Sequence, residues 1–139
     1  MSKKPVSDLI QAAKAVRNYA YAPYSGLMVG AAVECEHGHI HVGCNVENAA
    51  YPEGLCAEAN AISTLIANSG SHIRQICIIS NHKLPIPPCG GCLQKIREFA
   101  ESATPVIICG ADEKPIHYTL GDLLPHAFTP ELLETKHER

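Results

Sequence analysis

Four residues in two short segments have the types and spacing of a reactive metal site. Cys56 and Glu58 lie one residue apart in EGLCAEANA, and Cys89 and Cys92 lie three apart in PPCGGC. Each segment stands at the predicted start of a helix, where the partial positive charge of the helix end favours a thiolate. Because Cys-x-x-Cys is both a zinc half-site and a redox motif, the second segment alone leaves two interpretations open.

Cys56 favours the zinc interpretation, because three thiolates from two helix starts can meet at one ion. Three protein ligands leave a tetrahedral position for water, as at catalytic zinc sites, and zinc lowers the pKa of that water. We expect Glu58 to carry protons there rather than to act as a fourth ligand. The alternatives are packing of the three cysteines in the core, and a closed structural site completed by another Cys or His.

The remaining cysteines lie in or beside predicted strands, and we interpret them as small core residues: Cys35, Cys44, Cys77 and Cys109. The total of seven cysteines is odd, and the first residues lack the apolar stretch of an export signal. We therefore expect reduced thiols and a cytoplasmic location.

The composition predicts one globular domain, which we place at residues 1–139. Hydrophobic residues make up 46% of the chain, charged residues make up 18%, and the net charge is −3. So little positive charge argues against general nucleic-acid binding, and no apolar run approaches the roughly 18 residues that cross a membrane. We therefore expect a small-molecule partner, no nucleic acid and no membrane.

The pattern of apolar residues predicts an α/β fold with three α/β/α layers, in which a mixed five-stranded sheet has helices on both faces. Two strand–helix–strand crossings predict a largely parallel section beside one antiparallel hairpin. The core is expected at about 6–133, followed by an exposed charged tail at 134–139. The predicted helices are 6–20, 56–68 and 90–100, and the predicted strands are 28–35, 39–44, 74–80, 105–109 and 115–118.

Together, CAE at 56–58 and PCGGC at 88–92 form the Cys₃ variant of the zinc-deaminase signature. The chain resembles the small homotetrameric cytidine deaminases over about 20–133. Three further stretches carry the resemblance: AYAPYSGLMVGAAV at 20–33, GCNVENAAYPEGLCAE at 43–58 and LLPHAFTPELL at 123–133. The resemblance implies the cytidine-deaminase fold and one zinc ion per subunit. It also implies hydrolytic deamination of cytidine and 2′-deoxycytidine in pyrimidine salvage, with Glu58 as the proton shuttle.

The resemblance also implies roles for individual substrate-binding residues. Asn45 and Glu47 match positions that bind the ribose 3′-hydroxyl, and Ala57 matches a position whose backbone contacts the base. Tyr51 matches a position near the pocket that is often reached from a neighbouring subunit, and Phe128 matches an aromatic that covers the base, also from a neighbour. These two matches imply a homotetramer in which neighbouring subunits complete each site.

Four positions depart from the family pattern. Leu27 and Met28 replace the usual Phe and Pro, and Ala59 and Leu93 replace arginines. Because Leu27 is smaller than a ring beside the pyrimidine, a modified cytidine or another aminated nucleoside or heterocycle remains an alternative substrate. The missing arginines motivate a second alternative, a zinc-stabilised and weakly catalytic binding protein, although retention of Glu58 argues against it.

The missing arginines also raise a question of charge. Zinc with three thiolates has a net charge of about −1, which the arginine after CAE offsets in the family. The helix N-termini, Lys95 and Arg97 are the groups that remain to offset it. The sequence leaves the choice among them open.

Overall fold

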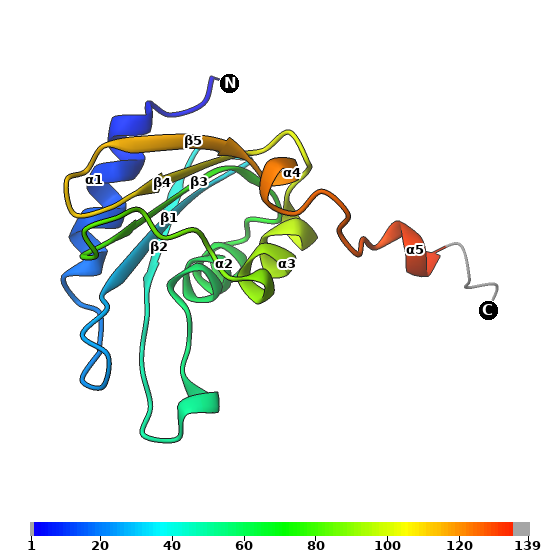
Figure 1. Cartoon of the computed structure of the whole chain (residues 1–139). Coiled ribbons are helices and arrows are strands. Elements are labelled where there is room, and N and C mark those ends of the chain that lie inside the picture. Colours follow the sequence, from blue (N-terminus) through cyan, green and yellow to red (C-terminus); the bar gives the residue numbers. More distant parts are fainter. Residues whose placement is uncertain (1, 135–139) are drawn as a thin grey trace.

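A computed structural model of the chain describes residues 2–134. Within them, five strands form one mixed sheet in the order β2-β1-β3-β4-β5 (Figure 1). The strands are β1 (Val29–Cys35), β2 (Ile40–Cys44), β3 (Ile73–Ser80), β4 (Pro105–Cys109) and β5 (Pro115–Thr119). The helices are α1 (Val6–Arg17), the 3₁₀ turn η1 (Tyr51–Glu53), α2 (Ala57–Ala67), α3 (Gly90–Phe99), α4 (Leu120–Leu123) and α5 (Glu131–Glu134).

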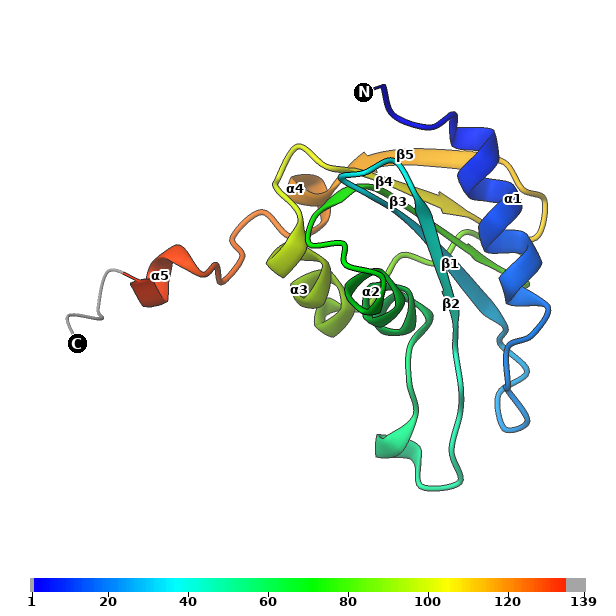
Figure 2. The same cartoon turned by 180° about the vertical axis from the view of Figure 1, so that it is seen from behind.

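Helices cover both faces of the sheet, which confirms the predicted three-layer α/β fold (Figures 1 and 2). On one face, Leu9 and Ala13 of α1 pack against alternate residues of β1, β3 and β4. On the other face, α2 and α3 pack against the intervening residues, among them Ile76 and Ile78 of β3. Because β3 is buried on both faces, its sequence is a nearly continuous apolar run rather than an alternating one.

The prediction of a largely parallel section was wrong. Only β3 and β4 pair in parallel among the described strands, because β1 lies between β2 and β3 and is antiparallel to both. The connection from β2 through α2 to β3 therefore passes over a strand instead of joining neighbours. The hairpin of β1 and β2 was predicted correctly, and Gly38 in its turn has a φ of 82°, which glycine adopts without strain.

The helix and strand boundaries agree with the sequence pattern to within one residue, except at the end of the first helix. This helix was predicted to reach residue 20 but ends at Arg17, where the amides of Tyr19 and Ala20 turn back to the carbonyls of Val16 and Arg17. Apolar residues continue at helical spacing as far as Ala20, so the apolar pattern alone does not show where the helix ends. The predicted tail at 134–139 lies outside the described residues, except for the backbone of residue 134.

The topology brings two helix starts to the same edge of the sheet. Because β2 and β3 are both antiparallel to β1, they run in the same direction, and their carboxyl ends lie at one edge. The chain leaves these ends to begin α2 and α3, respectively. Close packing then fixes α2, since a Cβ on Gly43 of β2 would lie 2.3 Å from the backbone nitrogen of Ala61.

Candidate metal centre and active site

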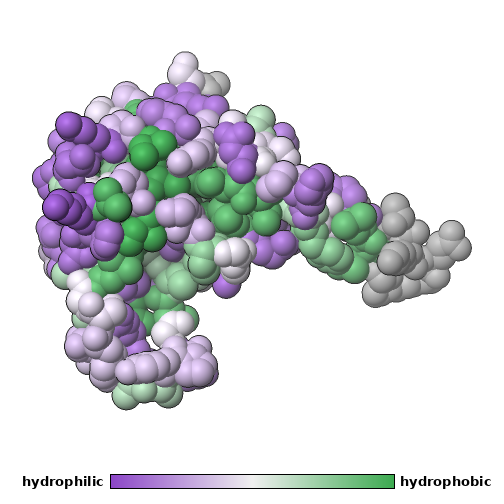
Figure 3. Space-filling view, in the orientation of Figure 1, coloured by the Kyte–Doolittle hydropathy of each residue, from purple (hydrophilic) through white to green (hydrophobic). Residues whose placement is uncertain are grey.

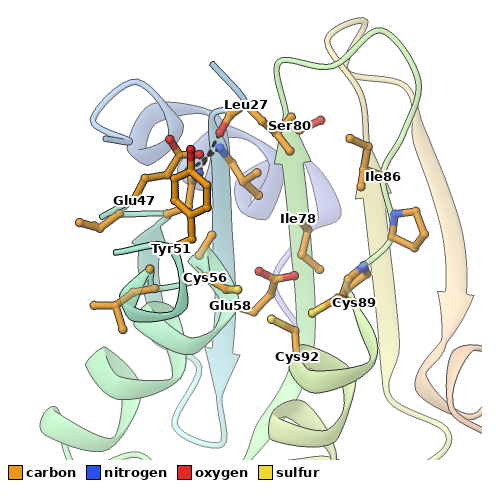
Figure 4. Close-up of a pocket in the computed structure, with 18 residues that line it drawn as sticks. Leu27, Glu47, Tyr51, Cys56, Glu58, Ile78, Ser80, Ile86, Cys89 and Cys92 are labelled. Carbon is orange, nitrogen blue, oxygen red and sulfur yellow. Dashed lines mark hydrogen bonds between the residues drawn. The ribbon is translucent and has the colours of Figure 1, made fainter. Parts of the chain in front are cut away.

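Three cysteine sulfurs meet where α2 and α3 begin (Figure 4). Cys56 is the N-cap residue of α2, Cys89 is the N-cap residue of α3, and Cys92 lies in the first turn of α3. Their Sγ atoms all lie within 4.8 Å of one another. The predicted convergence of these cysteines is therefore present in the fold.

The donor set fits a zinc ion. Tetrahedral zinc with Zn–S bonds of about 2.3 Å holds its sulfurs roughly 3.8 Å apart, which is compatible with the observed spacing. Within the described residues, the cluster of potential ligand atoms contains these three sulfurs and no histidine or carboxylate. Three thiolates with no fourth protein ligand match the open site of a catalytic zinc rather than a closed structural site.

The electrostatics of the cluster also favour a bound cation. Backbone N–H groups of Cys92 and Gly91 donate to Cys89 Sγ, and the first of these bonds contributes most to lowering the pKa of Cys89. By contrast, burial raises the pKa of Cys92, and the neighbouring charges of Glu58 and the other two cysteines raise it further. A divalent cation among the sulfurs would allow all three thiols to ionise together.

Glu58 is directed into the space that the sulfurs surround (Figure 4). It lies in the first turn of α2 and is only 5% exposed. Burial raises the pKa of its carboxyl, while hydrogen bonds from its own amide and from Cys92, together with the charge of Lys95, offset part of the rise. A carboxyl whose pKa is moved toward neutrality can both accept and release protons near neutral pH.

A cavity of about 380 Å³ opens above these four residues. It has room for a small ligand and is largely apolar, with few polar groups, as ligand sites usually are. The side chains of Ile78, Ile86 and Leu27 supply part of its apolar wall. Five of the six predicted substrate-binding residues line the cavity: Leu27, Asn45, Glu47, Tyr51 and Ala57.

Asn45 and Glu47 brace the segment that enters β1, a function that the sequence did not reveal. Asn45 Nδ2 donates to the carbonyl of Leu27 at 2.8 Å, and Asn45 Oδ1 accepts from the amide of Val29 at 2.8 Å. The Glu47 carboxylate accepts from the hydroxyl of Ser25 and from the amides of Tyr24 and Ser25. The hydrogen bond from the Ser25 side chain contributes most to lowering the pKa of Glu47, so its carboxylate is held ionised beside the cavity.

Tyr51 and Phe128 lie on two segments that project from the body (Figures 1 and 3). Tyr51 begins η1 at the tip of the 45–55 segment, is 77% exposed and packs edge-on against Tyr24. Phe128 lies on the C-terminal arm, is 54% exposed and is not among the described residues that line the cavity. The carbonyl of Phe128 accepts a hydrogen bond from Gln94 of α3 at 2.8 Å, which ties the arm to the body.

Several residues that line the cavity were not predicted from the sequence, including Ser80 and the loop residues Ile86, Pro87 and Pro88. Ser80 ends β3 at the edge where α3 begins, and ligands often bind at the carboxyl ends of parallel strands. Ser80 could therefore have been predicted to line the site, because it is a polar residue at the end of an apolar strand. The loop residues carry no comparable signal, because proline is common in any loop.

Comparison with known proteins identifies the family. The sequence model of the "Cytidine and deoxycytidylate deaminase zinc-binding region" matches residues 3–109. The chain belongs to this zinc-binding deaminase family. The match includes the two helix starts with all three cysteines and Glu58.

Curated relatives in the same family cover most of the chain. The cytidine deaminase of Sporosarcina psychrophila is 36% identical over 126 residues, which are 91% of this chain and 93% of the relative. The cytidine deaminase of Mycobacterium tuberculosis is 36% identical over 110 residues, which are 78% of each chain.

Solved structures of cytidine deaminases share the fold. That of Burkholderia pseudomallei has a TM-score of 0.85 and 38% identity, and it covers 90% of this chain and 100% of its own. That of Mycobacterium tuberculosis has a TM-score of 0.77 and 33% identity, and it covers 91% of this chain and 98% of its own. Among the described residues, no helix has the length and hydropathy that crossing a membrane requires.

Proposed function

We propose that this chain catalyses the zinc-dependent hydrolytic deamination of cytidine and 2′-deoxycytidine to the uridine forms and ammonia, in pyrimidine salvage. One observation carries the proposal: three cysteine sulfurs and a buried glutamate converge at the base of a cavity large enough for a small ligand. Relatives that cover nearly the whole chain are cytidine deaminases, which supports the choice of reaction.

Cys56, Cys89 and Cys92 would hold the zinc ion. Zinc bound in this way acts as a Lewis acid that makes a water molecule nucleophilic near neutral pH. In the reaction, a C4–O bond forms and the C4–N4 bond breaks. Glu58 accepts one proton from the attacking water and passes it to N3 of the base. It then takes the second proton from the new C4 hydroxyl and delivers it to the departing amine, which leaves as ammonia while the C4 carbonyl forms.

The remaining residues of the site position the nucleoside. Asn45 and Glu47 would bind the ribose 3′-hydroxyl, since both side chains border the cavity and are already held by backbone hydrogen bonds. Their fixed orientation lowers the entropy cost of binding. The backbone of Ala57 would contact the base, and Leu27 would border it from the segment that enters β1.

We further propose a homotetramer in which a neighbouring subunit completes each site. Two observations support this assembly: Tyr51 is 77% exposed at the tip of a projecting segment, and Phe128 lies on an arm and does not line the cavity of its own chain. Aromatic residues are enriched at protein–protein interfaces relative to the rest of the surface. The single-domain organisation and the cytoplasmic location remain predictions.

A substrate panel tests the proposed function. The purified, zinc-containing protein should lower the ultraviolet absorbance of cytidine and 2′-deoxycytidine as the amine is lost. It should act much more weakly on free cytosine, because a substrate without the sugar leaves Asn45 and Glu47 without their ligand. Turnover confined to base-modified cytidines would favour the alternative substrate and identify Leu27, which lines the cavity, as a determinant of specificity. Failure to turn over any aminated nucleoside with zinc bound would contradict the proposal and favour a binding protein.

A further inference from the structure

The metal site carries an unbalanced negative charge. Three thiolates and one zinc ion sum to a charge of about −1, and the buried carboxylate of Glu58 lies beside them. The starts of α2 and α3 supply partial positive charge, but each helix end is equivalent to only about half a charge. The surroundings of the site therefore determine how readily zinc is retained.

Arg97 does not reach the sulfurs. Its guanidinium NH1 donates to the carbonyl of Ala100 at 2.8 Å, so it caps the far end of α3. Cationic side chains favour this end of a helix. Arg97 is therefore occupied there, which removes one of the two basic candidates on α3.

Lys95 extends in the opposite direction, toward the cysteines. It lies four residues after Gly91, and helical side chains lean toward the N-terminus, over the preceding turn. A Cβ on Gly91 would lie 3.8 Å from Lys95 Nζ and 3.9 Å from Cys89 Sγ. The ammonium and the sulfur thus flank the same point, which no side chain occupies because residue 91 is glycine.

The N-terminal end of a helix disfavours a cation, so nearby negative charge, such as that of the Glu58 carboxyl, stabilises Lys95 in this orientation. In the described part of the chain, Lys95 forms no salt bridge with a carboxylate. It borders a surface hollow of about 440 Å³ between α2 and α3, together with Glu98 and Ala59. Ala59, which lines this hollow with a small side chain, directly follows Glu58 in α2.

We propose that Lys95 is the charge-balancing residue of the metal site, and that its ammonium beside Gly91 offsets the negative charge of the zinc–thiolate centre. Zinc that binds to neutral thiols releases their protons and leaves the centre anionic. A cation nearby stabilises the loaded site and so increases the affinity for zinc. This inference depends on the metal site of the proposed enzyme but not on the identity of its substrate.

Zinc affinity measured by competition with a chromogenic chelator at neutral pH tests the inference without any assay of activity. Lys95→Met should raise the dissociation constant for zinc about three- to tenfold, and Lys95→Glu should raise it further. Lys95→Arg should stay within about twofold of wild type, because the charge is retained. Lys83→Met, which removes the same charge from a loop outside this hollow, is the matched control and should have no effect.

Two further measurements separate a charge effect from a structural one. The difference between wild type and Lys95→Met should shrink in about 0.5 M salt, where charges are screened over a few ångströms. Adding Ala59→Arg to Lys95→Met should recover most of the lost affinity, since Ala59 and Lys95 border the same hollow. Thermal melting of the zinc-free proteins checks that each variant is folded.

An unchanged zinc affinity in Lys95→Met would overturn the inference, and so would an equal loss in Lys83→Met or a loss in Lys95→Met that does not depend on salt. If the protein deaminates cytidine but its zinc affinity does not depend on Lys95, the inference is rejected and the proposed function still holds. Conversely, Lys95-dependent zinc binding in a protein that turns over no nucleoside would support the inference and reject the function.

Discussion

The helix starts that carry the cysteines are packed into the body of the fold, whereas the segments that carry Tyr51 and Phe128 project from it (Figures 1 and 3). At the helix starts, Cys92 and Glu58 are buried and their positions are fixed by packing of α2 and α3 on the sheet. On the projecting segments, the two aromatic side chains are mostly exposed. The candidate metal ligands are thus brought together within one chain, while in the proposed assembly the two aromatic side chains act on a second copy.

The largest expected effect follows from removing a metal ligand. Cys92→Ala should abolish stoichiometric zinc binding and reduce activity to background, because two thiolates do not hold zinc tightly enough for an open catalytic site. Metal analysis after gel filtration measures the zinc content. Cys35→Ala is the matched control, since Cys35 is equally buried but lies in the core at the far end of β1. Full zinc content in Cys92→Ala would contradict the proposed ligand set.

A smaller loss should follow from changing the C-terminal arm. Phe128→Ala should lower kcat/KM for cytidine roughly 10- to 100-fold, because stacking of a base on an aromatic ring contributes about 1–3 kcal/mol. Zinc content should remain at the wild-type level. Leu132→Ala, another exposed apolar residue on the arm, is the control and should have little effect.

Mixing two impaired variants tests whether Phe128 acts in the site of a neighbouring subunit. If Phe128 acts in the site of a second copy, mixed oligomers of Phe128→Ala and Glu58→Gln contain some sites with both native residues. Activity should therefore recover after subunit exchange, while a sizing column reports the assembly. A monomer on the column, or no recovery despite exchange, would show that Phe128 does not complete a neighbouring site.

A modest loss is expected where the body meets the projecting 45–55 segment. Ser25→Ala removes the hydroxyl that donates to the Glu47 carboxylate, so that carboxylate is less firmly held. The KM for cytidine should rise about three- to tenfold with little change in kcat. The rise should be absent for cytosine, because the free base has no ribose. An equal rise in KM for both substrates would argue that Glu47 does not bind the ribose.

The smallest effect on activity is expected at the hairpin turn, at the opposite end of β1 from the cavity. Hydrogen bonds from Ser71 lower the pKa of Glu36 to about 2 from its usual 4.5. The bond from the Ser71 hydroxyl contributes most, and the bond from the Ser71 amide contributes next. Because the folded-state pKa is depressed, the carboxylate stabilises the fold above about pH 4.5, and this contribution is lost as pH falls toward 2. Melting temperatures should therefore fall more steeply below pH 4.5 for wild type than for Glu36→Gln, while kcat/KM at neutral pH is unchanged. Parallel curves for the two proteins would contradict this assignment.

The metal site was largely predictable from the sequence, but the arrangement of the strands was not. Cysteine spacing and helix-start signals are local, so they predicted that Cys56, Cys89 and Cys92 converge at two helix starts, as they do in the fold. Strand pairing is long-range, and no local pattern reveals that β1 lies between β2 and β3. The bracing contacts of Asn45 and Glu47 were hidden for the same reason, since they join residues far apart in the chain.

Glu58→Gln tests the central claim most directly, because it removes the proton carrier and leaves the cysteines unchanged. Zinc content and the rate of cytidine deamination are measured on the same preparation, beside wild type. We predict one zinc ion per chain in both proteins and a loss of kcat of at least roughly a hundredfold in the variant. Wild-type turnover by zinc-loaded Glu58→Gln would contradict the account.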